Sequence, residues 1–253
     1  MSKIALITGA TSGIGKACAE IYAQNGYQLI ITGRRADRLA EFKDQLESDY
    51  PVKVKTLCFD VRDRNEVEKN LQALSNDLKK VDILINNAGL SQGLDSLQNG
   101  NLDDWDTMID TNIKGLLYVS KIVSNWMIAE KKGHIVNIGS IAGKEVYANG
   151  NVYCATKHAV DALNKAMRID LLPHGIKVTG IHPGAVETEF SIVRFHGDEK
   201  KAAKIYEGYE PLVAQDIAET IYFTTSRPSH VNINDLVIMP TAQASAFYWN
   251  KEV

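Results

Sequence analysis

The stretch NVYCATKHAV places Tyr153 and Lys157 four residues apart. In a helix, side chains at this spacing lie on one face. A free phenol has a pKa of about 10, which is too high for an efficient proton acceptor near neutral pH. A neighbouring ammonium group stabilises the phenolate and lowers that pKa. The pair therefore predicts a tyrosine that exchanges a proton with a substrate, although an ordinary surface pair on a helix has the same spacing.

A glycine-rich stretch, ITGATSGIGKA, follows an apolar run and precedes a helical pattern. A sharp turn from strand to helix needs residues that tolerate positive φ. A pyrophosphate at a helix N-terminus benefits from bare backbone and from the helix dipole. A plain turn would use similar residues, but the position between strand and helix favours a dinucleotide site. The candidate cofactor-binding residues here are Gly9, Thr11, Ser12, Gly13, Ile14 and Gly15.

The second apolar run ends in ITGRRAD, which places Arg34 and Arg35 about 20 residues beyond the glycines. An acidic residue at this position binds the ribose 2′-hydroxyl of NAD, whereas arginine accommodates the 2′-phosphate of NADP. Guanidinium groups bind phosphate in a bidentate manner. Two solvated arginines at a helix start would give the same pattern, but they would oppose the helix dipole. The pair favours NADP.

Short apolar runs alternate with longer amphipathic stretches along the chain. This alternation predicts repeated βαβ units, and hence a single-domain α/β fold with a doubly wound parallel sheet and helices on both faces. The expected strands are 4–8, 28–33, 53–59, 81–87, 134–140, 177–184 and 236–240. The expected helices are 14–25, 36–48, 64–78, 102–131, 151–172 and 213–226. The interval 185–212 fits the alternation worst and is interpreted as a substrate lid within one domain, 1–253.

Composition and charge exclude several classes of function. The net charge of −3 offers no basic surface for nucleic acid. No apolar run approaches membrane-spanning length. Cys18, Cys58 and Cys154 are widely spaced and odd in number, which fits a reducing compartment. No cluster of His, Cys, Asp or Glu has metal-ligand spacing. A cytoplasmic protein without a resident metal is expected.

The chain resembles the short-chain dehydrogenase/reductase family in the stretches TGATSGIG, NNAG and DTNIKG, in Ser140 and in the Tyr153-x-x-x-Lys157 pair. The resemblance runs from the first strand to the last. Further stretches resemble the NADP-dependent 3-hydroxy acid dehydrogenases of that family, which act on serine-like 3-hydroxy acids and on malonic semialdehyde. These stretches are TGRR, NNAGL, WDTMIDTN, NGNVY, EFSIVRFHGD and HVNIN.

The resemblance implies a set of catalytic roles. Ser140 would hold the substrate oxygen, and Tyr153 would exchange the proton. Lys157 would also bind the nicotinamide ribose, and Asn112 would hold a water that links Lys157 to solvent. Without the resemblance, Asn112 is equally well a buried polar residue of a helix.

The resemblance also implies further cofactor contacts. Asp60 would contact the adenine amino group, and Val61 would follow with its backbone; alternatively, Asp60 caps the next loop. Asn87 would lie beside the adenosine ribose, or it would simply support the turn after the fourth strand. The remaining residues implied by the family pattern are Ala88, Gly89, Pro183, Gly184, Val186 and Thr188.

Arg194 is the only cation in an apolar part of the suspected lid, FSIVRFHGD. An arginine fork matches a carboxylate. Arg194 is therefore a hypothetical clamp for the substrate carboxylate, alongside Ser140 and Tyr153, and an exposed lid arginine is the alternative.

Two stretches, 111–131 and 151–172, carry apolar residues on more than one face. One face can meet the sheet and another a second subunit. Family members commonly form tetramers through these helices, so a homotetramer is expected. The aromatic residues Phe247, Tyr248 and Trp249 are expected to pack on a neighbouring subunit.

The sequence thus predicts an NADP-dependent oxidoreductase that acts on small 3-hydroxy acids. A reductase of another carbonyl, such as a 3-oxoacyl thioester or a xenobiotic ketone, is the alternative within enzymes. A cofactor-binding sensor without catalysis is a further alternative. Such sensors usually lack a catalytic residue, whereas Asn112, Ser140, Tyr153 and Lys157 are all present here.

Overall fold

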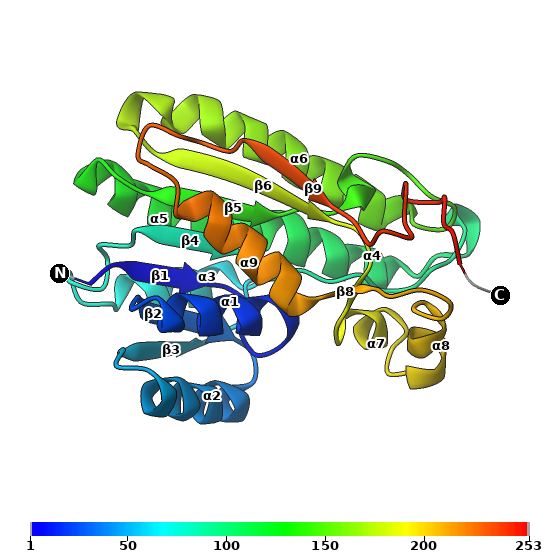
Figure 1. Cartoon of the computed structure of the whole chain (residues 1–253), viewed down its shortest axis with the longest axis horizontal. Helices are drawn as coiled ribbons and strands as arrows, with labels where there is room; N and C mark the ends of the chain where they lie inside the picture. Colours follow the sequence, from blue (N-terminus) through cyan, green and yellow to red (C-terminus); the bar gives the residue numbers. More distant parts are fainter. Residues whose placement is uncertain (1, 252–253) are drawn as a thin grey trace.

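The computed structural model describes residues 2–251, and it contains one seven-stranded parallel sheet (Figure 1). The strands lie in the order β3-β2-β1-β4-β5-β6-β9. Their near-continuous burial is typical of a parallel sheet that is covered on both faces. Their bounds are β1 Ile4–Ile7, β2 Gln28–Gly33, β3 Val54–Cys58, β4 Ile83–Asn86, β5 His134–Ile138, β6 Lys177–Pro183 and β9 Asp235–Ile238.

The helices pack against the sheet in two hydrophobic clusters, one on each face. One cluster joins the sheet to α1 (Gly13–Gln24), α2 (Ala36–Asp49) and α9 (Ala214–Thr225). The other joins it to α3 (Arg64–Gln72), α5 (Leu116–Glu130) and α6 (Asn151–Leu171). The predicted doubly wound fold with helices on both faces is confirmed.

The order of the strands reverses direction at β1. Leu6 of β1 lies opposite Ile30 of β2 on one side and Leu84 of β4 on the other. The chain builds outward through β2 and β3, then crosses to β4 and builds the other half. In open α/β sheets, ligands bind outside the carboxyl ends of the strands at this point of reversal.

Two predicted helices differ from the observed ones. The third ends at Gln72 because Ser75 begins a turn and the Lys79 ammonium group donates to the carbonyl of Gln72 at 2.9 Å. The long helix expected over 102–131 is divided into α4 (Leu102–Ile109), a π-helical turn (Asp110–Gly115) and α5. Such π-turns are frequent at functional sites.

The interval predicted to be a lid has its own small framework. Strand β7 (Val186–Glu187) pairs in parallel with β8 (Leu212–Val213), and two short helices lie between them. These are α7 (Phe190–Arg194) and α8 (Glu199–Lys204), which lie together beyond the carboxyl edge of the sheet in Figure 1.

The C-terminal segment folds back on its own chain. Gln243 and Trp249 form an antiparallel bridge, and the Trp249 ring lies 4.8 Å from the Tyr209 ring, centroid to centroid. Trp249 therefore packs in part on its own chain, and its predicted contact with another subunit stays a prediction. Phe247 and Tyr248 point outward and are 69% and 68% exposed. None of the helices among residues 2–251 is both long and apolar enough to cross a bilayer.

Candidate active site

A cleft of about 300 Å³ opens at the carboxyl edge of the sheet, at the point where the strand order reverses. It lies between the glycine-rich turn, the ends of β2, β4, β5 and β6, and the segment after β7. Every predicted site residue lines this cleft except Gly15, Asn112 and Arg194. The fold thus brings together residues that are spread over most of the sequence.

The glycine-rich turn presents free backbone at the start of α1. Gly13 has a φ of +51°, which favours glycine. Ser12 is the N-cap, but its side chain makes no capping hydrogen bond, and the first turn of α1 contains no acidic residue. The first amide groups of a helix need an acceptor. These features fit the phosphates of a dinucleotide.

Gly15 is needed for close packing and does not line the cleft. A Cβ atom on Gly15 would lie 2.4 Å from the Asn87 amide nitrogen and from the Gly9 carbonyl oxygen. Asn87 itself donates to the carbonyls of Thr8 and Gly9, at 2.8 and 3.1 Å. Asn87 therefore ties the end of β4 to the end of β1, as the alternative interpretation of this residue proposed, and it also lines the cleft.

Arg35 lies across the turn, while Arg34 extends outward. The Arg35 guanidinium donates to the Thr11 hydroxyl at 2.8 and 3.2 Å and to the Ser12 hydroxyl at 3.0 Å. The Arg34 side chain is 57% exposed and lies 3.8 Å from the Asp60 carboxylate. Two guanidinium groups therefore lie at the rim of the cleft, where they fit a ribose 2′-phosphate.

Asp60 is held by its own loop. Its carboxylate accepts from the Arg62 side chain at 2.7 and 3.0 Å and from the Arg62 backbone amide at 3.0 Å. Burial works to raise the pKa of Asp60, but the Arg62 hydrogen bonds and the Arg34 charge lower it overall. Asp60 thus supports its loop and lines the cleft at the same time, next to Val61.

Tyr153, Ser140 and Lys157 meet on the opposite side of the cleft. Tyr153 and Lys157 come from the first turns of α6, and Ser140 follows β5. The Ser140 side chain lies close enough to the Tyr153 hydroxyl to lower the pKa of that group. The Lys157 ammonium donates to the Ile138 carbonyl at 2.9 Å and lies 5.9 Å from the centre of the Tyr153 ring. A substrate oxygen can therefore reach two hydroxyl groups at once.

Burial dominates the protonation of this group. It raises the pKa of Tyr153 well above its usual value, and Tyr147 adds to this effect, while Arg194 and the Ser140 side chain oppose it. Burial also lowers the pKa of Lys157 to about 8. The pKa of Tyr153 therefore lies above its usual value in this structure, because loss of hydration outweighs the charge of Arg194. The expected effect of Lys157 on the phenol stays a prediction.

Asn112 lies behind these residues, in the π-helical turn. Its amide nitrogen donates to the Leu90 carbonyl at 2.8 Å and to the Thr156 hydroxyl at 3.0 Å. Its side-chain oxygen accepts from the Leu90 amide at 2.9 Å. A Cβ on Gly89 would lie 3.2 Å from that oxygen and 3.5 Å from the Lys157 nitrogen. Asn112 therefore approaches Lys157 across Gly89, where an added Cβ would be tight against the Asn112 oxygen.

Arg194 lies on the far side of Tyr153. Its guanidinium carbon is 5.3 Å from the centre of the Tyr153 ring and 5.1 Å from that of Phe190. One of its nitrogens donates to the Tyr147 hydroxyl at 3.2 Å. Its Nε is buried and lacks a hydrogen-bond partner among the described residues. A cation with a free donor thus lies beside the candidate catalytic tyrosine.

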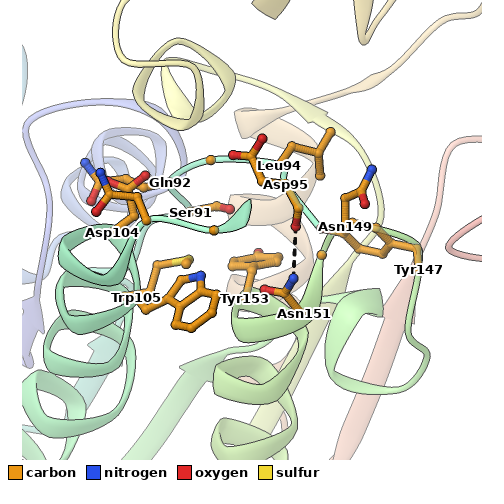
Figure 2. A pocket seen from close by; sticks show the side chains of 15 residues that line it. Ser91, Gln92, Leu94, Asp95, Asp104, Trp105, Tyr147, Asn149, Asn151 and Tyr153 are labelled. Carbon is orange, nitrogen blue, oxygen red and sulfur yellow. Dashed lines mark hydrogen bonds between the residues drawn. The ribbon is translucent and has the colours of Figure 1, made fainter. Parts of the chain in front are cut away.

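A small hollow of about 10 Å³ adjoins Tyr153 on this side. Figure 2 shows the Tyr153 ring between Trp105 and Asn151, with Tyr147 across the hollow. The Asn151 amide donates to the Asp95 carbonyl at 2.9 Å, which fixes the start of α6 to the loop before α4. This hollow extends the site beyond the cleft.

The turn after β6 approaches the cleft as expected. The Gly184 amide donates to the Ile238 carbonyl at the end of β9, at 2.8 Å. A Cβ on Gly13 would lie 3.3 Å from the Thr188 side chain, so the turn from Pro183 to Thr188 lies against the glycine-rich turn. Thr188 also accepts from the Phe190 amide at 3.3 Å, at the start of α7.

Several lining residues were not predicted from the sequence. They are Thr32, Gly33, Phe59, Leu90, Thr111, Ile138, Gly139, Glu189, Phe190 and Val193. Most lie at the carboxyl end of a predicted strand or next to a predicted site residue, which is a signal that sequence reasoning could have used. Glu189 follows the predicted residue Thr188, but the sequence could not indicate its ion pairs, because its partners lie about 150 positions earlier in the chain.

The fold also brings together Asp161, His182 and Asp235, which sequence spacing did not suggest. His182 is buried and lies 2.7 Å from the Asp235 carboxylate. Lys144 bonds the carboxylates of Asp161 and Asp235 at 2.7 and 3.2 Å, and Lys165 bonds Asp161 at 2.6 Å. Because lysines take up the carboxylate oxygens, we interpret the group as an ion-pair network.

The doubly wound sheet, the free helix start and the grouped Ser, Tyr and Lys side chains define a dinucleotide-dependent oxidoreductase. The chain belongs to the short chain dehydrogenase family, whose model matches residues 3–198.

Three proteins are similar to this chain over nearly its whole length. The NADP-dependent 3-hydroxy acid dehydrogenase YdfG of Escherichia coli (strain K12) is 43% identical, over 96% of this chain and 97% of that protein. The sulfoacetaldehyde reductase 2 of Chromohalobacter salexigens is 45% identical, over 98% of each chain. The closed form of a serine dehydrogenase complexed with NADP⁺ superposes with a TM-score of 0.91 at 43% identity, covering 99% of this chain and 100% of that one.

Proposed function

We propose that this protein is an NADP-dependent oxidoreductase that interconverts a small 3-hydroxy acid and its carbonyl form. The observation that carries the proposal is the convergence of Ser140, Tyr153 and Lys157 on a cleft that begins at the glycine-rich turn. The 3-hydroxy acid dehydrogenase and serine dehydrogenase relatives support the substrate class. The presence of all four catalytic candidates supports turnover over a sensor role.

NADP is the cofactor in this proposal. The amide groups at the start of α1 would hold its phosphates, and Arg34 and Arg35 would hold the 2′-phosphate. Asp60, Val61 and the stretch from Asn87 to Gly89 would border the adenosine. Pro183, Gly184, Val186 and Thr188 would border the nicotinamide end. When bound, the reduced cofactor supplies a hydride to the substrate carbon.

The protein's own residues handle the proton. Ser140 and Tyr153 hold the substrate oxygen between their hydroxyl groups, and Tyr153 donates its proton in reduction and accepts it in oxidation. Because burial raises the pKa of Tyr153, the phenol keeps its proton at neutral pH, which favours proton donation. Lys157, which is buried and has a pKa of about 8, remains largely an ammonium at pH 7 and can hold a ribose hydroxyl. Asn112 would hold the water that connects Lys157 to solvent.

Arg194 would bind the substrate's anionic group. Its free Nε and its position over the Tyr153 ring fit a short substrate whose anion and hydroxyl are a few atoms apart. A sulfonate is a second candidate for that anion, because the sulfoacetaldehyde reductase relative is 45% identical over nearly the whole chain.

The three cysteines are free, which supports a reducing, cytoplasmic location.

The test is formation of NADPH from NADP with 3-hydroxypropionate, L-serine and 2-hydroxyethanesulfonate, with NAD in parallel. We expect turnover with NADP and a hydroxy acid. In Tyr153→Phe, kcat should fall by about 10²- to 10⁴-fold, since the variant loses its proton donor and acceptor. The Kd for NADPH should stay within about twofold, which separates lost chemistry from lost binding.

Two results would contradict the proposal. Undiminished turnover in Tyr153→Phe would remove the tyrosine from the mechanism. Tight NADPH binding without turnover of any substrate in the panel would keep the cofactor and discard the substrate class. If only the sulfonate is turned over, the proposed substrate would be a hydroxysulfonate instead of a 3-hydroxy carboxylic acid.

A further inference from the structure

Glu189 connects the segment after β7 to the start of α2. It lies two residues after the end of β7, as the N-cap of α7, and it lines the cleft. One of its carboxylate oxygens is 3.0 Å from an Arg35 nitrogen, and the other is 2.8 Å from an Arg38 nitrogen. Arg35 and Arg38 lie at the start of α2, so one carboxylate bridges two guanidinium groups.

The remaining donors of Arg35 are already occupied. Its Nε and Nη2 groups bond the hydroxyls of Thr11 and Ser12, and only Nη1 faces Glu189. Thr188 packs against Gly13, so Glu189 lies over the same turn that holds Arg35. An anion in the cleft that binds Arg35 therefore meets a guanidinium group that already holds the Glu189 carboxylate.

Glu189 is ionised at neutral pH. Burial works to raise its pKa, but hydrogen bonds from Arg35 and Arg38 lower it overall. A carboxylate and a phosphate cannot share the same two arginines without strong repulsion between like charges. The two anions therefore compete for the same donors.

We propose that Glu189 is a specificity-determining residue whose carboxylate competes with the ribose 2′-phosphate for Arg35 and Arg38, so that the 2′-phosphate binds by displacing it. The inference rests on the proposed use of NADP. In this arrangement Arg38 joins the residues that bind the phosphate. The free energy of binding the 2′-phosphate is then that of its own ion pairs less that of the Glu189 ion pairs that it displaces.

The alternative role of an acidic residue at this place is a direct one. A carboxylate can accept from the ribose 2′-hydroxyl of NAD, which selects for the cofactor without the phosphate. In that role, removal of the charge weakens binding of a ligand that lacks the 2′-phosphate. In the competing role, removal of the charge tightens binding of the ligand that carries it.

The experiment is calorimetric titration with adenosine 2′,5′-bisphosphate and with adenosine 5′-monophosphate, which differ only in the 2′-phosphate. The proteins are the wild type, Glu189→Gln and the matched control Glu187→Gln. Glu187 lies on β7, is exposed, and takes part in none of the ion pairs found among residues 2–251. Both variants remove one negative charge, at positions two residues apart in the chain.

We expect Glu189→Gln to bind the 2′,5′-bisphosphate about five- to tenfold more tightly than the wild type, because two competing surface ion pairs are lost. Affinity for the 5′-monophosphate should stay within about twofold. Glu187→Gln should leave both affinities close to those of the wild type.

Three results would overturn the inference. If the wild type prefers the 2′,5′-bisphosphate but Glu189→Gln matches Glu187→Gln, the inference fails while the proposed cofactor stands. If Glu189→Gln weakens the 5′-monophosphate, Glu189 binds the ribose instead. If the wild type binds both ligands equally, the proposed use of NADP fails, and the inference fails with it.

Discussion

The burial of the charged Lys157 side chain lowers the free energy of unfolding. Its side chain is buried, its ammonium donates to one backbone carbonyl, and its pKa falls from 10.5 to about 8. A lowered pKa in a buried lysine reflects lost hydration of the charge. The folded protein therefore tolerates an unfavourable cation at the place where the proposed mechanism needs one.

The sign of the stability effect follows from proton binding. Between pH 8 and 10.5 the unfolded chain holds this proton more firmly than the folded chain, so stability rises with pH across that window. Below pH 8 the full penalty applies. At about 1.4 kcal/mol for each pKa unit, the penalty at pH 7 is about 3 kcal/mol as an upper bound.

We predict that Lys157→Met unfolds at higher denaturant concentration than the wild type at pH 7. The gain should be on the order of 1–3 kcal/mol, reduced by the lost hydrogen bond to Ile138, and it should shrink toward pH 10. Urea unfolding at both pH values measures it. Lys165→Met, which removes an exposed ammonium from the same helix, should show no gain. A gain that does not change with pH would contradict the burial argument.

At the scale of elements, the segment between β7 and β8 delivers Arg194 to the site. Helix α7 places the arginine against Tyr153, Phe190 and Tyr147, and the Gly93 amide donates to its backbone carbonyl at 3.0 Å. The segment thus connects to the loop before α4 as well as to the cleft. A lid that covers 185–212 remains a proposal that fits this framework.

We predict that Arg194→Met raises KM for 3-hydroxypropionate by about 10- to 100-fold, because charge-assisted hydrogen bonds to the carboxylate are lost. KM for a neutral alcohol such as 1,3-propanediol should change little. Steady-state kinetics with both substrates measure the difference. Arg227→Met is a matched control, since Arg227 also stacks on a phenylalanine ring, at 4.3 Å, but follows the end of α9. Equal effects on the acid and the neutral alcohol would refute the clamp.

The elements themselves were largely predictable, and their connections were less so. Buried β-branched runs gave all seven strands of the main sheet to within three residues at each end. The π-helical turn at Asp110–Gly115 was not predicted, because one inserted residue barely changes apolar periodicity. Ser140, Tyr153 and Lys157 were recognisable by type and spacing. Glu189 was not, because its role depends on partners brought near only by the fold.

At the scale of the whole molecule, several apolar side chains remain uncovered on the described surface. Ile169 and Leu172 at the end of α6 are 72% and 73% exposed, and Phe247 and Tyr248 stand out from the C-terminal segment. Exposed apolar groups of this size commonly mark contacts between proteins. They support the proposal of a homotetramer.

We predict that the double variant Phe247→Ser, Tyr248→Ser associates more weakly than the wild type, since it loses two exposed rings that would be buried between subunits. Light scattering after size-exclusion chromatography measures the mass. Leu97→Ser, which removes a side chain that is 65% exposed elsewhere, should leave the mass unchanged. A double variant that remains a fully active tetramer, or a monomeric wild type, would contradict the prediction.

The stacking of Trp249 on Tyr209 also gives the protein an intrinsic optical reporter. Tyr209 lies just before β8, at the end of the segment that contains α7 and α8, and the ammonium of Lys251 lies over both rings. Indole emission depends on such neighbours. The chain has three tryptophans, so replacing Trp105 and Trp126 by phenylalanine would leave Trp249 alone. Its fluorescence would then follow movement of that segment in real time, without an attached dye.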